Sequence, residues 1–261
     1  MNKLKAIFEP LKVLDKKTMT TLLVAEAVLA LLVWQLSGGG LIPTPDKVLK
    51  AVGTIFSMPD FIDNLFASIA LTIKGMVLSI IIALFISYLS IVPAFQPIAR
   101  FVIKCRYLTL TGLIFLFTLL TQNGGQLKLS LLIFGIVPFF VTTLLGVIDG
   151  ISKQEFELCT TLRMNSWQSL WEVVIVGRLD QVFEVMRQNF AIAWLMITSV
   201  EGLSMSQGGL GVMLIKANKY VQLDIVFGTL VIIFALGIFF DFILGLFRHW
   251  LFPYTKLQTR R

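Results

Sequence analysis

The chain has 261 residues, of which 57% are hydrophobic and only 14% are charged, and its mean hydropathy is +0.87. A soluble domain would carry about a quarter charged residues, so the composition excludes an ordinary soluble protein. The long apolar runs also exclude a membrane β-barrel, whose strands alternate in polarity. The formal net charge of +7 could suggest nucleic-acid binding. The positions of the basic residues along the chain instead indicate how the protein is oriented in a membrane. We therefore predict an all-α polytopic membrane protein that lies in the lipid bilayer. We do not expect nucleic acid among its partners.

Apolar segments of about 20 residues can cross a bilayer as helices, and the sequence has room for about six. We place them at 19–36, 67–92, 103–121, 128–149, 186–204 and 223–247. Residues 1–18 form a polar N-terminal segment, and residues 19–261 form the transmembrane domain. Since no Ala-x-Ala cleavage site follows the first run, we expect a retained anchor and not a signal peptide.

The basic residues predict the orientation of these spans. With the spans so placed, sixteen of the 22 lysines and arginines fall on one side and five on the other, with Lys74 inside the second span. Positive residues are in excess on cytoplasmic loops. We therefore predict that both termini are cytoplasmic, in agreement with an even number of spans.

The segment at about 150–185 is the longest predicted cytoplasmic loop. It is too polar to span the membrane, yet its apolar residues, among them Phe156, Trp167 and Trp171, recur at helical spacing. Large apolar side chains on a cytosolic surface must be buried against something. The alternatives are the protein's own helices and a soluble partner.

Within this loop, residues 157–168 read Glu-Leu-Cys-Thr-Thr-Leu-Arg-Met-Asn-Ser-Trp-Gln. This stretch resembles the cytoplasmic loop of permease subunits of type I ABC importers, in the nitrate/sulfonate/taurine/bicarbonate group. Glu157, Leu162, Trp167 and Gln168 fit the common form of that loop, whereas Arg163 stands where glycine is usual. The resemblance extends in order over about 40–250, through matching stretches at 41–45, 135–140, 201–203 and 207–211, and through Asp241.

The resemblance implies a transmembrane dimer in a bacterial inner membrane, working with cytosolic ABC ATPases and an external substrate-binding protein. It implies that the loop forms a coupling helix seated in the ATPase. The residues that would make this contact are Glu157, Thr160, Leu162, Arg163, Met164, Asn165 and Trp167.

The sequence has no Gly-x-x-x-x-Gly-Lys-[Ser/Thr] phosphate loop, so ATP would bind to a partner subunit. We expect a transport subunit, not an enzyme, with no bound cofactor. Serine and threonine residues lack matching histidines or acids, so no catalytic set is predicted. Cys105 and Cys159 show no metal-ligand spacing, so no metal site is predicted.

Four residues are candidates for the translocation path: Glu201, Gln122, Asn123 and Pro138. Glu201 precedes a glycine-containing loop. Gln122 and Asn123 end the third predicted span, where they could touch the solute or simply cap a helix. Pro138 lacks a backbone N–H and predicts a kink in the fourth span.

Three other charged residues fall within or near predicted spans, where an unpaired charge costs several kcal/mol. We expect Lys74 near the external end of the second span. Glu26 is expected to face the helix bundle or a second copy of the chain, and Asp241 to pair with Arg248 or a neighbour.

Two other functions stay open at this point. A secondary transporter or channel would need internal repeats and carboxylates that bind the coupling ion. A non-transporting membrane scaffold would need neither. Transport that depends on ATP would separate the importer from both.

Overall fold

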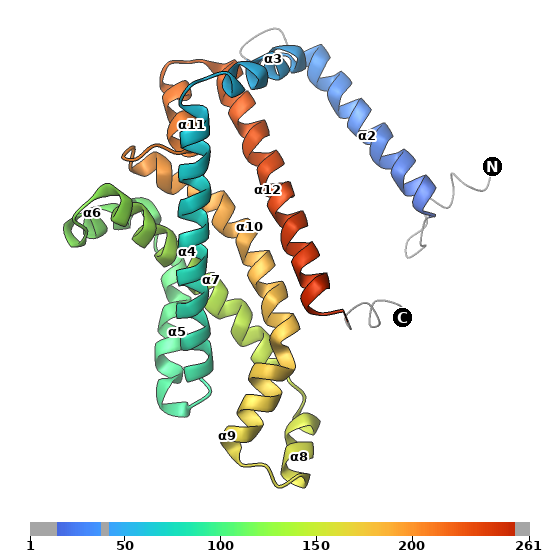
Figure 1. The fold of residues 1–261 in the computed structure, drawn as a ribbon, viewed down its shortest axis with the longest axis vertical. Helices are drawn as coiled ribbons and strands as arrows, with labels where there is room; N and C mark the ends of the chain where they lie inside the picture. The colour runs from blue at the N-terminus through green and yellow to red at the C-terminus, as the bar shows by residue number, and fades with distance from the viewer. Residues whose placement is uncertain (1–14, 38–41, 254–261) are drawn as a thin grey trace.

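The computed structural model describes residues 15–37 and 42–253, and every regular element in these ranges is helical (Figure 1). This confirms the predicted all-α class. Most of the predicted segment 1–18 and the glycines at 38–40 lie outside the described residues. The long helices and their shorter companions follow one another in the order α2 Lys16–Ser37, α3 Pro45–Phe56, α4 Phe61–Leu89, η1 Pro93–Phe95, α5 Gln96–Lys104, η2 Cys105–Tyr107, α6 Leu110–Leu120, α7 Gly124–Asp149, α8 Lys153–Thr161, α9 Ser166–Ser169, η3 Leu170–Ile175, η4 Val176–Arg178, α10 Leu179–Leu203, α11 Leu210–Lys219 and α12 Leu223–Leu251.

Four helices in the described ranges are long and apolar enough to cross a membrane: α2, α4, α7 and α12. A fifth crossing is possible if the bent pair Pro93–Tyr107 and Leu110–Leu120 counts as one. Helix α10 has 25 residues and is long enough, but it carries several charged residues. A polytopic membrane protein is therefore confirmed. Which side of the membrane holds the termini stays a prediction.

The predicted span at 103–121 is not one continuous helix. Helix α6 has only 11 residues, and it lies at 115° to the preceding Pro93–Tyr107 segment. The bend occurs where Leu108 and Thr109 adopt extended backbone. At 1.5 Å per residue, α6 is about 16 Å long, which is about half the bilayer core.

The core lies where α4, α7 and α10 pack together. Helix α4 buries a row of small residues in this core, and this row consists of Ser68, Thr72, Gly75, Ser79, Ala83 and Ser87. A Cβ atom on Gly75 would stand 2.5 Å from Leu132 Cδ2 of α7. Small residues allow two membrane helices to approach closely, and dispersion contacts then hold them together.

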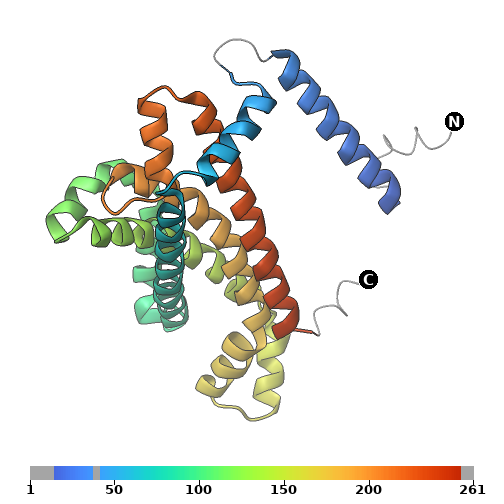
Figure 2. The same cartoon turned by 45° about the horizontal axis from the view of Figure 1, so that its top comes forward.

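Helix α2 stands apart from this core. It leans away from the body in both Figure 1 and Figure 2, and none of its apolar window is buried. Its end near α3 is tied down: Trp34 Nε1 donates to the Pro43 carbonyl over 3.1 Å, and the Trp34 and Phe227 rings lie 6.5 Å apart. Glu26 is exposed, so the expectation that it faces the bundle of its own chain is wrong. Its contact with a second copy stays a prediction.

Ion pairs connect α10 to α12 near the end of the molecule that carries α8 and α9. Arg187 Nε and Nη2 each donate to Asp241, over 2.8 Å, and Arg248 Nη1 lies 2.7 Å from Glu184 Oε2. Asp241 therefore pairs with a neighbour, Arg187, and not with Arg248. These pairs allow a charged helix to pack among apolar ones.

We expect Asp241→Asn to destabilise the protein more than the double variant Asp241→Asn/Arg187→Gln. The single change leaves a guanidinium without its carboxylate, whereas the double change removes both charges. Because both side chains are partly exposed, the single variant should cost only about 1 kcal/mol. Thermal unfolding in detergent measures this. Equal losses in the two variants would contradict the pairing.

Candidate functional site

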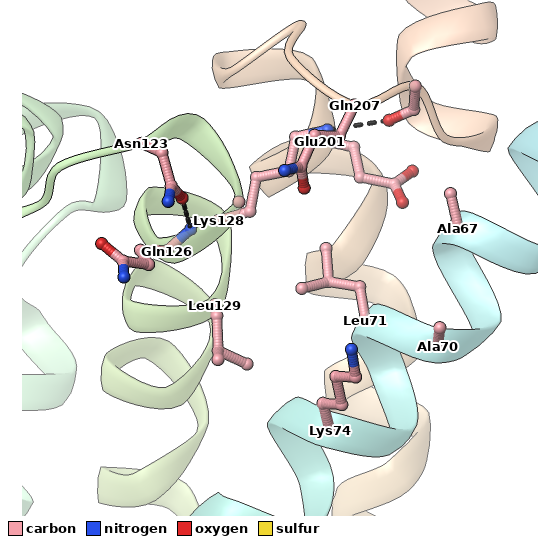
Figure 3. Close-up of a pocket in the computed structure, with 12 residues that line it drawn as sticks. Ala67, Ala70, Leu71, Lys74, Asn123, Gln126, Lys128, Leu129, Glu201 and Gln207 are labelled. Atoms are coloured by element: carbon pink, nitrogen blue, oxygen red, sulfur yellow. Dashed lines mark hydrogen bonds between the residues drawn. The ribbon is translucent and has the colours of Figure 1, made fainter.

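A pocket of about 370 Å³ lies at the α11 end of the molecule, between α4, α7, the end of α10 and the loop that follows α10 (Figure 3). We call this loop, residues 204–209, the α10–α11 loop. The pocket is lined by small, apolar, amide and charged side chains: Ala67, Ala70, Leu71, Lys74, Asn123, Gln126, Lys128, Leu129, Glu201 and Gln207, together with Gly125 and Gly208.

Glu201 holds this end of the molecule together. Its side chain is only 1% exposed. One carboxylate oxygen accepts a hydrogen bond from Ser68 Oγ over 2.7 Å, and the other accepts from the Gly211 N–H over 2.8 Å. Ser68 Oγ in turn accepts from the Leu210 N–H over 2.8 Å. One buried carboxylate on α10 thus connects this helix to α4 and α11. The hydrogen bonds that it accepts stabilise its negative charge.

Two further side chains hold the α10–α11 loop. Lys128 of α7 donates to the Gly208 carbonyl over 2.8 Å, and Asn64 of α4 accepts from the Gly209 N–H over 2.8 Å. Gly209 has φ +122°, and a Cβ atom there would collide with the Glu201 carboxylate. Only glycine fits this position, which explains the glycine-containing sequence of the loop.

The structure places Glu201 on the pocket wall, where the sequence predicted a residue of the translocation path. Its carboxylate is already bonded to the protein, so its observed contacts are structural. The sequence did not point to Ser68, Asn64 or Lys128 as partners of Glu201 and its loop, since Ser68 lies 133 positions from Glu201. The row of small polar residues on α4 was the one signal in the sequence that could have indicated Ser68.

Lys74 lies near the middle of the 29-residue helix α4, not near its end as predicted, because α4 begins at Phe61. Figure 3 shows its side chain directed toward the pocket that it lines. Within residues 15–37 and 42–253, the structure shows no hydrogen bond or ion pair to its ammonium group. Of the two lysines that line the pocket, Lys128 is thus bonded to the Gly208 carbonyl, and Lys74 shows no such bond within the described residues.

The structure assigns capping contacts to Gln122 and Asn123. Asn123 Oδ1 accepts from the Gln126 N–H over 2.9 Å at the start of α7, and the Gln122 N–H donates to Gln126 Oε1 over 3.2 Å. Asn123 also lines the pocket, whereas Gln122 does not. The capping alternative is thus observed for Asn123, whereas Gln122 contributes only its backbone N–H to this contact.

Pro138 lies elsewhere, on a separate apolar pocket of about 400 Å³ beside Phe117 and Phe134. Helix α7 continues unbroken through it from Gly124 to Asp149, and the Pro138 carbonyl accepts from Thr142 Oγ1 over 2.7 Å. The proline does not break the helix, and the structure does not bring Pro138 together with Glu201.

The opposite end of the molecule carries a small helical lobe formed by α8, α9, η3 and η4. It corresponds to the predicted loop at 150–185, although α10 begins earlier, at Leu179. An ion pair between Arg178 and Glu155 connects the two ends of the lobe. Asn165 caps α9 by accepting from the Ser166 N–H, and the Asn165 N–H donates to Gln168 Oε1 over 2.8 Å. Paired caps of this kind fix the start of a short helix.

Most of the predicted coupling residues are exposed on this lobe. Glu157, Thr160, Leu162, Arg163, Asn165 and Trp167 are exposed, and Met164 is half-buried. Leu162 is 65% exposed and Trp167 is 67% exposed, and Leu158 and Trp171 are exposed as well. Burial of these four apolar side chains against the protein's own helices, one of the two alternatives, is thus contradicted.

In the part of the chain that the structure describes, no group of three or more His, Cys, Asp or Glu side chains could hold a metal ion. One end of the molecule thus carries a pocket lined by Lys74, and the other end carries exposed apolar side chains.

Comparison with known proteins adds a family likeness. Residues 52–252 match the model of the family described as binding-protein-dependent transport system inner membrane component. An archaeal protein from Methanocaldococcus jannaschii, named as an ABC transporter permease, is 27% identical over 119 residues, which are 45% of this chain and 44% of that protein. A Bacillus subtilis protein named for aliphatic sulfonate transport, the permease protein SsuC, is 27% identical over 100 residues, 38% of this chain and 36% of that protein. The matched region thus spans less than half the length of either relative.

We expect Glu201→Gln to destabilise the α11 end by about 1–3 kcal/mol, because an amide NH₂ would replace an acceptor that now faces a donor. Hydrogen exchange should become faster at the Leu210 and Gly211 amides. Glu157→Gln, an exposed change on the opposite lobe, serves as the matched control. Unchanged exchange in Glu201→Gln would contradict the role of this carboxylate.

Proposed function

Because the chain belongs to the family of binding-protein-dependent transport system inner membrane components, we propose that it is the permease subunit of an ATP-driven importer in a bacterial inner membrane. That it is a multi-pass membrane permease subunit of an ABC transporter follows from the family and its apolar helices. The proposal adds the direction of transport, its coupling to ATP and the partners. These are cytosolic ABC ATPases, an external substrate-binding protein and a second copy of the permease.

The exposed apolar surface of the lobe carries this proposal. Leu158, Leu162, Trp167 and Trp171 project from short helices that caps and an ion pair hold in place. Exposed aromatic and aliphatic side chains on such a surface are typical of interaction sites. A cytosolic ATPase that receives them in a groove would cover this surface and supply the phosphate-binding loop that the sequence lacks.

Helix α10 offers a mechanical route for alternating access. It begins at Leu179, directly after the lobe, and ends beside Glu201 on the pocket wall. A movement of the lobe would displace α10 as a rigid body and change the contacts of Glu201 with Ser68 and Gly211. The pocket would then open to one side of the membrane or the other, as ATP is bound and hydrolysed on the partner.

A small anionic solute is the class that we propose for this importer. The pocket is lined by Lys74, whose ammonium group has no bond within the described residues, and by the amides of Gln126 and Gln207. Charged groups within membrane helices are costly and commonly serve transport. The name of the Bacillus subtilis relative, which refers to aliphatic sulfonates, supports the same class.

We expect Trp167→Asp and Glu157→Ala to weaken ATPase binding while leaving insertion into the membrane intact. The first change places a charge on the apolar surface, and the second removes a carboxylate from the same face. The measurement is the amount of ATPase that co-purifies from native membranes in mild detergent, identified by mass spectrometry. Wild-type amounts in both variants would count against coupling through this lobe. If wild-type protein brings no ATPase while it remains folded, the secondary transporter and the scaffold take precedence.

We expect Lys74→Gln to reduce ATP-dependent uptake of a radiolabelled aliphatic sulfonate at least tenfold in proteoliposomes that contain the whole transporter. Lys216→Gln, at an exposed position on α11, is the matched control because it removes one lysine outside this pocket. Equal uptake in wild type and Lys74→Gln would contradict the anion assignment, whereas uptake without ATP would contradict the importer.

A further inference from the structure

Arg163 occupies a backbone position that normally belongs to glycine. Helix α8 ends in a motif where the Met164 N–H donates to the Cys159 carbonyl and the Arg163 N–H donates to the Thr160 carbonyl, each over 3.0 Å. Arg163 has φ +54°. This is the pattern of the Schellman motif, in which the left-handed residue is most often glycine. A residue with a Cβ atom pays about 1–2 kcal/mol in this left-handed conformation. Arginine at position 163 therefore lowers the free energy of unfolding relative to glycine.

The side chain of Arg163 makes no bond that would offset this cost. It is exposed, and within residues 15–37 and 42–253 the structure shows no hydrogen bond or ion pair to its guanidinium group. Two large apolar residues close to it in the sequence are exposed as well: Leu162, which precedes it, and Trp167, four positions later. Backbone strain that no contact within the chain explains is found mainly at functional sites.

If the exposed surface around Leu162 and Trp167 docked on a partner, the guanidinium group of Arg163 would be removed from water. If Leu162 and Trp167 enter a groove on the ATPase, Arg163 goes with them, and a buried cation without a partner is costly by several kcal/mol. A carboxylate in the groove removes that cost, since arginine and carboxylate form strong, directional hydrogen bonds. We propose that Arg163 binds an acidic side chain in the ATPase groove and thereby selects the ATPase that this permease accepts. The proposal rests on the coupling function proposed above.

The chain contains a matched control for the strain. Helix α11 ends in the same motif: the Gln222 N–H donates to the Ala217 carbonyl over 2.9 Å, the Val221 N–H donates to the Asn218 carbonyl over 3.0 Å, and Val221 has φ +55°. Val221 is exposed and lies at the opposite end of the molecule from α8 and α9 (Figure 1). Glycine at either position removes strain, but only one of the two changes alters the proposed docking surface.

The test compares Arg163→Gly, Arg163→Lys and Val221→Gly in full-length protein against the purified ATPase that co-purifies with wild type. Both glycine variants should have a higher midpoint of thermal unfolding than wild type. Arg163→Gly should nevertheless bind the ATPase at least tenfold more weakly, whereas Val221→Gly should bind like wild type. Weaker binding by a more stable protein could not be attributed to misfolding.

Arg163→Lys places an amine where the guanidinium stood. A carbodiimide joins an amine to a carboxylate in direct contact, so cross-linking followed by mass spectrometry should identify one acidic residue of the ATPase. Equal ATPase affinity in wild type and Arg163→Gly, or a cross-link to no acidic residue, would overturn the proposal for Arg163. Failure of wild type itself to bind any ATPase would instead overturn the importer function.

Discussion

Polar groups buried among apolar helices must find partners within the protein, and this requirement determines how α10 is held. At one end, Glu201 binds Ser68 and the Gly211 N–H. Midway, Asn189 donates to Thr143 Oγ1 over 2.9 Å, and Trp194 Nε1 donates to the Ile233 carbonyl over 2.9 Å. Toward the other end, Arg187 binds Asp241. Helix α10 is thus bonded to α4, α7, α11 and α12 along its length.

This arrangement connects the two ends of the molecule. The lobe that presents the exposed tryptophans leads directly into α10, and α10 leads to the pocket and to the α10–α11 loop. Because each of these hydrogen bonds has a preferred geometry, a displacement of α10 would have to carry α4, α7, α11 and α12 with it or break its bonds to them.

The sequence was sufficient for the long apolar helices, because their signal is local. Helices α4, α7 and α12 lie close to the predicted ranges. Hydropathy did not reveal the bend within the span predicted at 103–121, where the extended residues Leu108 and Thr109 separate two short helices.

The candidate site was less predictable, because its contacts join distant parts of the chain. The glycine-containing loop directed attention to Glu201, but no spacing rule connects Glu201 with Ser68 or Lys128 with Gly208. The position of Arg163 was recognised as unusual from the sequence. The reason why glycine suits it, a left-handed residue at the end of α8, required the backbone. The coupling role of the lobe stays a prediction.

The ion pairs between α10 and α12 also bear on how the chain enters the bilayer during synthesis. The insertion machinery releases helices into lipid according to their apolarity, and charged residues at the centre of a helix oppose that release. Helices α2, α4 and α7 are apolar enough to be released one at a time. Arg187 and Glu184 lie 3.9 Å apart within α10, and their shorter contacts, to Asp241 and Arg248, are made with α12. The charges of α10 therefore gain their closest partners when α12 has been made, which would favour entry of the two helices together.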